Sequence, residues 1–416
     1  MHLSGKISRM EKPASGYKWY ILALAMLTDI LTVAMPGMAM AVLAKQIASD
    51  LQLNLVQVGV IWGIGSLPTI VTSLLGGILG DRFGSRRVLA FSALCAGLLG
   101  AVRGLAGGFV PLLILTLLGG SLAPFITMNA VKVAGQWFPR KQLGLANGAL
   151  GGGMAFGFLL GTLLSDAVLS PWLGGWRNVL IAYGLVGALT GLPWLFVRQA
   201  PGDEVRQGSP AGIRSNVRHV TGLKIVWQLG LVMFGVTGAI QGILGYLPLY
   251  LRNLGWAPLR ADQTVSMFHI ASLALVLPIT IWSDRLGSRK LLLVLATLLI
   301  VIGSGLLGFA SGGLILAAVL VTGCVRDSFM SLAFALLLDE ERVTSALSGT
   351  ALGMLVGISN IGSFLAPPLG NSLAKMTPAA PFLFWCSLAL FGLILLLQIK
   401  PAARPMVEIP MNQEIN

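Results

Sequence analysis

Three ionisable residues lie in the middle of long apolar stretches of this sequence. Asp29 follows an apolar run that begins near residue 20, and Arg326 and Asp327 lie midway along the apolar stretch 313–338. A charged side chain at the centre of a membrane helix costs about 2.5 to 3.5 kcal/mol on insertion scales, so such residues are expected to be functional. A guanidinium binds anionic groups, and a carboxylate can exchange protons. These residue types predict an anion site and a proton site inside a membrane protein.

Arg326 and Asp327 are neighbours in the sequence, and we expect them to address different partners. Adjacent side chains project about 100° apart on a helix and do not face each other, so a simple mutual ion pair is not expected. We predict that Arg326 faces a central cavity and binds an anionic group of the substrate. Asp327 would also contribute there, by meeting another helix or by sharing the cavity with Asp29. The alternative is a buried network that only fixes helix packing.

Asp29 is the preferred candidate for proton coupling, with Asp327 as the second. Burial in an apolar cavity disfavours the charged form of a carboxylate, which lets the group exchange a proton near neutral pH. The hydroxyls of Thr28 and Thr32 are near enough in the sequence to bond Asp29 instead. Asp29 would then have only a static structural role.

Other polar residues inside the apolar stretches are weaker candidates. His269 could relay protons or bind substrate, although a neutral histidine satisfied by its neighbours is the slightly stronger interpretation. As further substrate contacts we consider Asn129, Gln241 and Asn360. No pair of histidines has metal-ligand spacing, the three cysteines lie in apolar runs, and no phosphate-binding loop is present. We therefore expect neither a metal nor a cofactor.

Membrane helices must position these residues. Hydrophobic residues make up 56% of the 416 residues and charged residues 10%, whereas soluble domains carry about 25% charged residues. A bilayer core about 30 Å thick needs roughly 20 apolar residues per helix, which is too long for barrel strands of about 10 residues. We therefore predict an all-α protein with twelve spans, at residues 19–43, 55–79, 88–106, 110–131, 143–165, 178–197, 225–251, 264–282, 291–310, 313–338, 347–369 and 381–398.

The spans divide into two sets of six. We expect an N-terminal bundle at 18–197 and a C-terminal bundle at 225–399, joined by a polar linker at 198–224 and flanked by tails at 1–17 and 400–416. Lys and Arg near helix ends are retained on the cytoplasmic side. With the N-terminus inside, they number 20 on the cytoplasmic side against 6 on the other, so we expect both termini in the cytoplasm. The net charge of +13 is spread over alternate loops, so no nucleic-acid partner is expected.

Two loops nearly repeat each other 203 positions apart, at matching places in the two halves. Such a repeat indicates a duplicated membrane protein. The first copy contains Gly77, Gly80, Asp81, Arg82, Gly84, Arg86 and Arg87, and the second contains Asp284, Arg285, Gly287 and Arg289. The second copy departs from the first by having Ile281 or Trp282 where glycines would stand.

The loop motif, the six-plus-six arrangement and the central linker resemble the major facilitator superfamily over essentially the whole chain. The resemblance implies two pseudo-symmetric bundles of six helices, with the repeated loops as a conformational latch. Asp81 would hold one of two access states by docking against a helix of the opposite half. The alternative interpretation is a cytoplasmic turn, whose basic residues follow the positive-inside rule and whose aspartate caps a helix.

The fifth and eleventh spans are rich in glycine at matching positions. Small residues four apart let helices pack backbone to backbone, so we expect these two helices to slide or bend at the interface between the halves. Passive packing is the alternative. The expected packing positions are Gly148, Gly152 and Gly157 in the fifth span and Gly349, Gly353 and Gly357 in the eleventh.

We expect a secondary transporter that moves a small anionic organic solute by alternating access with proton coupling. Its partners would be the solute, protons and the lipid bilayer, and we expect a monomer in a bacterial inner membrane. The glycine-rich run has a weak resemblance to the nitrate and organic-anion branches of the family. Efflux of a cationic drug by proton antiport, through Asp29 and Asp327, is the alternative. A non-transporting receptor on the same fold is less favoured, and no clustered nucleophile, base or metal set predicts an enzyme.

Overall fold

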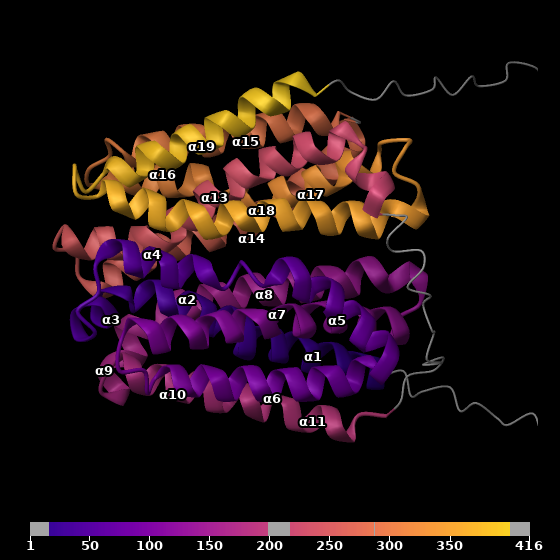
Figure 1. The fold of residues 1–416 in the computed structure, drawn as a ribbon, viewed down its shortest axis with the longest axis horizontal. Helices are drawn as coiled ribbons and strands as arrows, with labels where there is room; N and C mark the ends of the chain where they lie inside the picture. The colour runs from indigo at the N-terminus through magenta and orange to yellow at the C-terminus, as the bar shows by residue number, and fades with distance from the viewer. Residues whose placement is uncertain (1–15, 199–216, 287, 400–416) are drawn as a thin grey trace, which may run out of the picture.

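The computed structural model describes residues 16–198, 217–286 and 288–399, which form helices and no strands. Twelve helices within these ranges are long and apolar enough to cross a membrane, which confirms the predicted all-α fold class. The tails at 1–15 and 400–416, most of the expected linker (199–216) and Gly287 of the second loop lie outside the described residues. Figure 1 shows the helices in two layers, with α1 to α11 in one layer and α13 to α19 in the other.

The first layer contains six spans, four of them built from more than one helical segment. Its elements are α1 (Tyr17–Asp29), the π-helix η1 (Ile30–Ala34), α2 (Met35–Val42), α3 (Ala44–Asp50), α4 (Leu55–Ile64), α5 (Thr69–Phe83), α6 (Ser85–Arg103), α7 (Phe109–Trp137), the 3-10 helix η2 (Arg140–Gln142), α8 (Leu143–Leu164), the π-helix η3 (Ser165–Leu169), α9 (Ser170–Leu173), α10 (Trp176–Leu189) and α11 (Gly191–Phe196).

The second layer contains the other six spans. Its elements are α13 (Lys224–Asn253), α14 (Pro258–Leu286), α15 (Arg289–Leu307), α16 (Gly313–Gly323), α17 (Arg326–Leu338), α18 (Ser345–Leu373) and α19 (Ala380–Gln398). Each predicted span overlaps one of the twelve candidate membrane spans. The tenth predicted span, 313–338, is not one continuous helix, because α16 and α17 are separated by a turn.

Glycine positions explain the close packing inside the second layer. The indole of Trp385 on α19 is fully buried and donates a hydrogen bond to the carbonyl of Ala366 at 2.9 Å. A Cβ atom at Gly370 would lie 2.5 Å from that ring, and one at Gly242 on α13 would also collide with it. Only glycine leaves room for the indole between α13 and α18 at these positions.

The bundle has two ends that differ in how tightly the halves meet. We call the end where α1 begins and α19 ends the terminal end, and the opposite one the distal end (Figure 1). The closest approach runs along α4 and α18 on the distal side. A Cβ at Gly59 would lie 2.8 Å from the backbone of Pro368, and one at Gly63 would lie 2.5 Å from the carbonyl of Phe364.

The glycine contacts between the same two spans are looser toward the terminal end. A Cβ at Gly357 would meet only a side chain of α5, that of Ile70, at 3.4 Å, and one at Gly349 would have nothing within 4 Å. Hydrogen bonds across the interface also lie toward the distal side. Asn371 donates to the carbonyl of Leu55 at 2.9 Å, and the Trp62 indole donates to the carbonyl of Gln241 at 2.7 Å. This conformation is closed at the distal end.

Candidate functional site

A broken helix brings Arg326 to a helix N-terminus inside the bundle. α16 ends at Gly323 and α17 begins at Arg326, after a turn at residues 324–325. The turn sits where α14 crosses, because a Cβ at Gly323 would lie 2.6 Å from the carbonyl of Phe268. The first N–H groups of a helix carry partial positive charge and bind anions. An arginine at the first position of α17 adds a full positive charge to that site.

Arg326 and Asp327 form a mutual ion pair, so the prediction that they would not pair was wrong. The guanidinium Nη1 lies 3.2 Å from Asp327 Oδ1. The 100° separation keeps short side chains apart, whereas the long arginine side chain at the start of α17 reaches the carboxylate of the next residue. Asp327 also meets another helix, because Ser272 of α14 donates to its Oδ2 at 2.7 Å.

Phe158 of α8 places a side chain of the first half against this site. The Arg326 guanidinium carbon lies 5.3 Å from the centroid of the Phe158 ring, a distance typical of a cation–π contact. The imidazole of His269 stacks on the same ring, with centroids 5.8 Å apart and planes inclined by 25°. Phe158 of the first half therefore contacts both Arg326 and His269 of the second half.

The exposure of these side chains separates a ligand-accessible part of the site from a buried part. Arg326 is 21% exposed and Asp327 is 31% exposed, so both can contact a solute. His269 is 1% exposed, and neither ring nitrogen has a hydrogen-bond partner among the described residues. The structure therefore offers no support for the interpretation of His269 as a histidine satisfied by its neighbours.

Asp29 is the last residue of α1, immediately before the π-helix η1. Its side chain is 3% exposed, and Oδ1 has no hydrogen-bond partner among the described residues. The two hydroxyls considered as its partners are engaged elsewhere. Thr28 accepts from the Trp194 indole at 2.9 Å and donates to Leu24, while Thr32 lies 3.2 Å from the Thr190 hydroxyl. Asp29 is therefore a buried carboxyl without the static partners that sequence reasoning proposed.

A second buried aspartate, Asp166, also lies at a π-helix. It lies in η3, the second π-helix, and each π-helix is followed two residues later by a proline, Pro36 or Pro171. Proline has no N–H to bond the carbonyl one turn back, which disturbs the regular helix. Single-turn π-helices occur frequently at functional sites. A buried aspartate lies immediately before η1 and another lies within η3.

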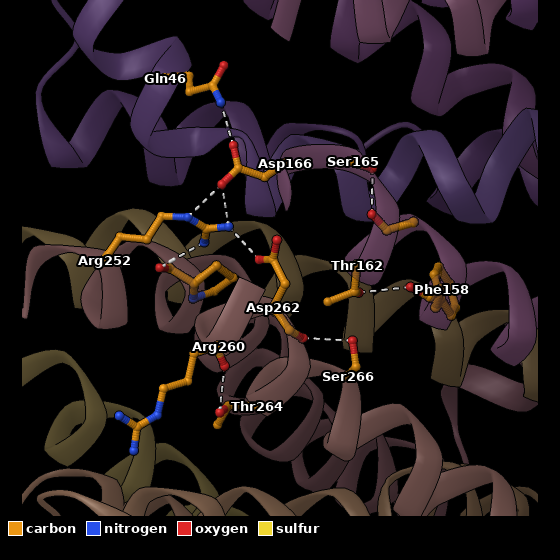
Figure 2. A network of polar contacts seen from close by, with 12 residues as sticks. Gln46, Phe158, Thr162, Ser165, Asp166, Arg252, Arg260, Asp262, Thr264 and Ser266 are labelled. Atoms are coloured by element: carbon orange, nitrogen blue, oxygen red, sulfur yellow. Dashed lines mark hydrogen bonds and ion pairs between the residues drawn. The ribbon is translucent and has the colours of Figure 1, made fainter. Parts of the chain in front are cut away.

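Asp166 belongs to a buried charge cluster that sequence reasoning did not find. Arg252 at the end of α13 contacts it through Nε at 2.8 Å and Nη2 at 2.7 Å, and the same Nη2 contacts Asp262 of α14 (Figure 2). The three side chains are 5% exposed or less. We call Asp166, Arg252 and Asp262 the distal triad. Because Asp166 is in the first half and the other two are in the second, the triad crosses the interface at the distal end.

The remaining polar candidates lie outside the contacts of Arg326. Asn129 is fully buried on α7 and donates to the carbonyls of Gly76 at 3.0 Å and Phe125 at 2.8 Å, which ties α7 to α5. Gln241 offers its backbone carbonyl to Trp62 and is half-buried, as is Asn360 on α18. Their contact with a substrate stays a prediction. Within the described ranges, no three His, Cys, Asp or Glu side chains gather to hold a metal ion.

The first latch loop makes its described contacts within its own half. Lys132 of α7 pairs with Asp81 at 2.7 Å and also bonds the carbonyl of Gly77, and Arg86 bonds the carbonyl of Val197. Gly84 supplies the turn between α5 and α6 with φ +84°, a conformation that favours glycine. Arg82 lies against the ring of its neighbour Phe83. Docking of Asp81 on the opposite half therefore stays a prediction for another conformation.

The second latch loop also contacts its own half. Arg289 donates to Asp339 at 2.6 Å, and Lys290 donates to the carbonyl of Ile399 at 2.5 Å. Arg285 is exposed at the end of α14. The other two predicted members, Gly287 and the side chain of Asp284, lie outside what the structure describes.

The predicted packing glycines fall into two groups. A Cβ at Gly157 would lie 2.7 Å from Ala34 of η1, so α8 and the first span are in close contact there. Gly357 faces Ile70, as described above, and Gly353 is half-buried on α18. In contrast, nothing lies within 4 Å of a Cβ at Gly148, Gly152 or Gly349. A methyl group at any of these three positions would therefore have open space around it in this conformation.

A family model for the Major Facilitator Superfamily matches residues 22–263 and 250–412 of the chain. A gallate transporter of Pseudomonas putida is 23% identical over 90% of this chain and 89% of its own length. A probable nitrate/nitrite antiporter, NarK1 of Thermus thermophilus, is 27% identical over 66% of this chain, and the match spans 63% of that protein.

Solved structures share the fold at low sequence identity. A mutant of the nucleoside transporter NupG superposes with a TM-score of 0.76 at 14% identity, covering 91% of this chain and 98% of its own. An inward open conformation of the xylose transporter XylE from E. coli has a TM-score of 0.72 at 19% identity and covers 92% of this chain and 95% of its own. At these identities the likeness concerns the fold alone.

Proposed function

The chain belongs to the major facilitator superfamily of membrane transporters, and from this premise we propose that it moves a small organic anion by alternating access, coupled to protons. The observation that carries the proposal is the position of Arg326. Its guanidinium is at the N-terminus of an interrupted helix, lies between the halves and is partly exposed. Half-helix N-termini that point at anionic substrate groups are a recurring feature of secondary transporters.

The charged and apolar groups of the site favour a carboxylate. Asp327 partly neutralises Arg326 at 3.2 Å, and its N–H donates to the Ser272 hydroxyl at 3.2 Å. The attraction for an anion therefore rests on the Arg326 guanidinium and on the remaining positive end of α17. Phe158 supplies an apolar ring beside the guanidinium. Two relatives are named as a gallate transporter and as a probable nitrate/nitrite antiporter, and these solutes are anions. Their names support the same class of substrate here.

Asp29 is the proposed coupling site for protons. A buried carboxyl with an unpartnered oxygen is costly as a fixed charge and gains by taking up a proton. Asp29 lies beside a π-helix of the first span, a place where a local change of helix geometry could link protonation to movement of the halves. The proton and the anion would then be bound in different halves of the molecule.

Efflux of a lipophilic cation is the second candidate. The observation that favours it is the exposure of Asp327, which at 31% exceeds the 21% of Arg326. The Asp327 carboxylate is already paired with Arg326 and accepts a hydrogen bond from Ser272, so its attraction for a cation is reduced. We therefore rank the cation second.

We further propose that the protein is a monomer of a bacterial inner membrane with both termini in the cytoplasm. The sequence count of 20 basic residues in the predicted cytoplasmic segments against 6 in the opposite loops supports this orientation. The conformation described here would then be closed toward the outside and looser toward the cytoplasm.

Transport by reconstituted protein tests the substrate class. Purified wild-type protein in proteoliposomes should take up or exchange a labelled aromatic or sugar carboxylate, and an imposed pH gradient should change the rate. Arg326→Gln should lower uptake at least tenfold, because it removes the charge at the α17 N-terminus. The matched control is Arg260→Gln, a change of the same type at an exposed residue that stacks on Trp256, and it should leave uptake unchanged.

Three outcomes would redirect the proposal. Uptake of lipophilic cations but not of anions would favour the second candidate. Binding without flux would indicate a receptor, because alternating access requires net movement or exchange. Equal loss of uptake in Arg326→Gln and Arg260→Gln would show that the effect of Arg326 is not specific to the site.

A further inference from the structure

The distal triad contains two carboxylates and only one guanidinium. Arg252 lies between Asp166 and Asp262, with exposed fractions of 4% for Arg252, 5% for Asp166 and 0% for Asp262. If both carboxyl groups were ionised, the cluster would hold one net negative charge away from water. A buried charge that is not paired is strongly unfavourable, so a compensating positive charge is expected in the closed form.

No neighbouring side chain among the described residues supplies that charge. Lys45 of α3 is exposed and donates its ammonium to the backbone carbonyl of Arg252 at 3.0 Å, and not to a carboxylate. Gln46 donates to Asp166 Oδ1 at 2.5 Å but is neutral. α16 has no titratable residue in its sequence, and from α8 the nearby hydroxyl of Thr162 is bonded to its own helix (Figure 2). The pair of Arg326 and Asp327 is farther along α14, because Asp327 contacts Ser272, ten residues beyond Asp262.

One carboxylate oxygen of the triad is left open. Asp262 Oδ1 contacts Arg252, whereas Asp262 Oδ2 is buried and has no hydrogen-bond partner among the described residues. Every other strong acceptor of the triad is occupied, since Asp166 Oδ1 accepts from Gln46 and Oδ2 accepts from Arg252. An unpartnered oxygen of a fully buried carboxyl group is the place in the cluster where an added proton removes a charge without breaking a contact.

Separation of the halves would change this charge balance. Arg252 and Asp262 are both in the second half, so they would stay together as a neutral pair when the distal end opens. Asp166 would leave with the first half and meet water, where a carboxylate is ionised at neutral pH. We propose that the distal triad is a proton-binding site: closing the distal end takes up one proton on Asp262, beside Arg252 and Asp166, and opening this end releases it.

Proton uptake on closure makes the conformational equilibrium depend on pH. Because the closed form binds one proton more than the open form, the closed fraction rises as pH falls. A single linked proton changes the ratio of closed to open molecules by at most about tenfold per pH unit. This site is distinct from Asp29, which lies on the first span and makes no described contact with the triad.

A distance measurement across the distal end tests the proposal without any substrate. Spin labels would be attached at Gly107→Cys and Ser311→Cys, two exposed positions in distal loops of the two halves, in a chain whose native cysteines are replaced by serine. A Cβ at Gly107 would meet nothing within 4 Å. In lipid nanodiscs, electron–electron double resonance measured at both an acidic and an alkaline pH should show a short-distance population that is larger at the acidic pH.

Two charge-balanced variants identify the site. Asp262→Asn leaves a neutral pair of Arg252 and Asp166, and Asp166→Asn leaves a neutral pair of Arg252 and Asp262. Each should remain closed over the pH range and lose the pH dependence, because its closed form needs no proton. Asp50→Asn, at an exposed acid of the same end that pairs with Arg177, should keep the wild-type response.

Either of two results would overturn the proposal. Wild-type protein with no pH-dependent change in the short-distance population would show that closure takes up no proton, even if neither triad variant folds. A response kept in both Asp262→Asn and Asp166→Asn would place the proton elsewhere. Because no anion is added, these outcomes are independent of the transport test of Arg326.

Discussion

The distal triad and the pair of Lys132 with Asp81 hold opposite ends of the molecule in different ways. The triad joins the two halves and is at most 5% exposed, whereas Lys132 and Asp81 lie in one half with exposed side-chain fractions of 29% and 59%. Loss of one partner from a buried ion pair costs about 3 to 5 kcal/mol, while an exposed pair contributes about 0 to 1 kcal/mol. The free energy that keeps this conformation closed is therefore concentrated at the distal end.

The largest expected effect follows removal of the central charge of the triad. Arg252→Gln leaves Asp166 and Asp262 facing each other without a cation, so the closed conformation should lose about 3 to 5 kcal/mol relative to the open one. At neutral pH most molecules should then be open at the distal end, as measured by the spin-label distance across that end.

Charge restoration and an exposed control separate this effect from general damage. The triple variant Arg252→Gln, Asp166→Asn, Asp262→Asn removes all three charges and should recover much of the closed population. Arg177→Gln breaks the exposed pair with Asp50 at the same end and should change the distances little. An Arg252→Gln protein that stays closed at neutral pH would contradict the weight given to the triad.

A smaller effect is expected from the glycine contact between α4 and α18. Gly63→Ala places a methyl group 2.5 Å from the Phe364 carbonyl, and overpacking of this kind costs about 1 to 3 kcal/mol. Because the clash exists only when the halves meet, the variant should shift the distal distance toward open. Gly349→Ala, with nothing within 4 Å of the added carbon, is the matched change, and an equal shift in both would count against closure along α4 and α18.

The smallest effect is expected at the terminal end. Lys132→Gln removes the exposed pair with Asp81, and it should lower the free energy of unfolding by no more than about 1 kcal/mol. Thermal unfolding in detergent would measure this as a small decrease in melting temperature. A loss as large as that of Arg252→Gln would mean that Lys132 supports more than its visible contacts with α5.

Sequence reasoning found the spans because each needs a long local run of apolar residues, and it found Asp29, Arg326 and Asp327 because each interrupts such a run. It missed the triad for a related reason. Asp166 and Arg252 stand one residue beyond the predicted ends 165 and 251, and Asp262 stands two residues before the predicted start 264. Their burial comes from the other half covering the helix ends, which is a non-local property.

The local sequence pattern also did not predict the break between α16 and α17. The stretch 313–338 is apolar enough for one helix, and the turn at residues 324–325 follows Gly323, where α14 approaches closely. That turn decides the pairing of Arg326 with Asp327 and creates the helix N-terminus on which the proposed anion site rests. An arginine followed by an aspartate inside an apolar span is the one local signal that could have suggested an interrupted helix.

Thermal stabilisation by candidate ligands tests the central proposal most directly, because a ligand that binds only the folded protein raises its melting temperature. Wild-type protein, Arg326→Gln and Arg260→Gln would be heated with a library of small organic anions and lipophilic cations at two pH values. We expect selected carboxylates to stabilise the wild type and Arg260→Gln, and to have no effect on Arg326→Gln. Stabilisation by cations alone, or by the same anions in Arg326→Gln, would contradict an anion site at the start of α17.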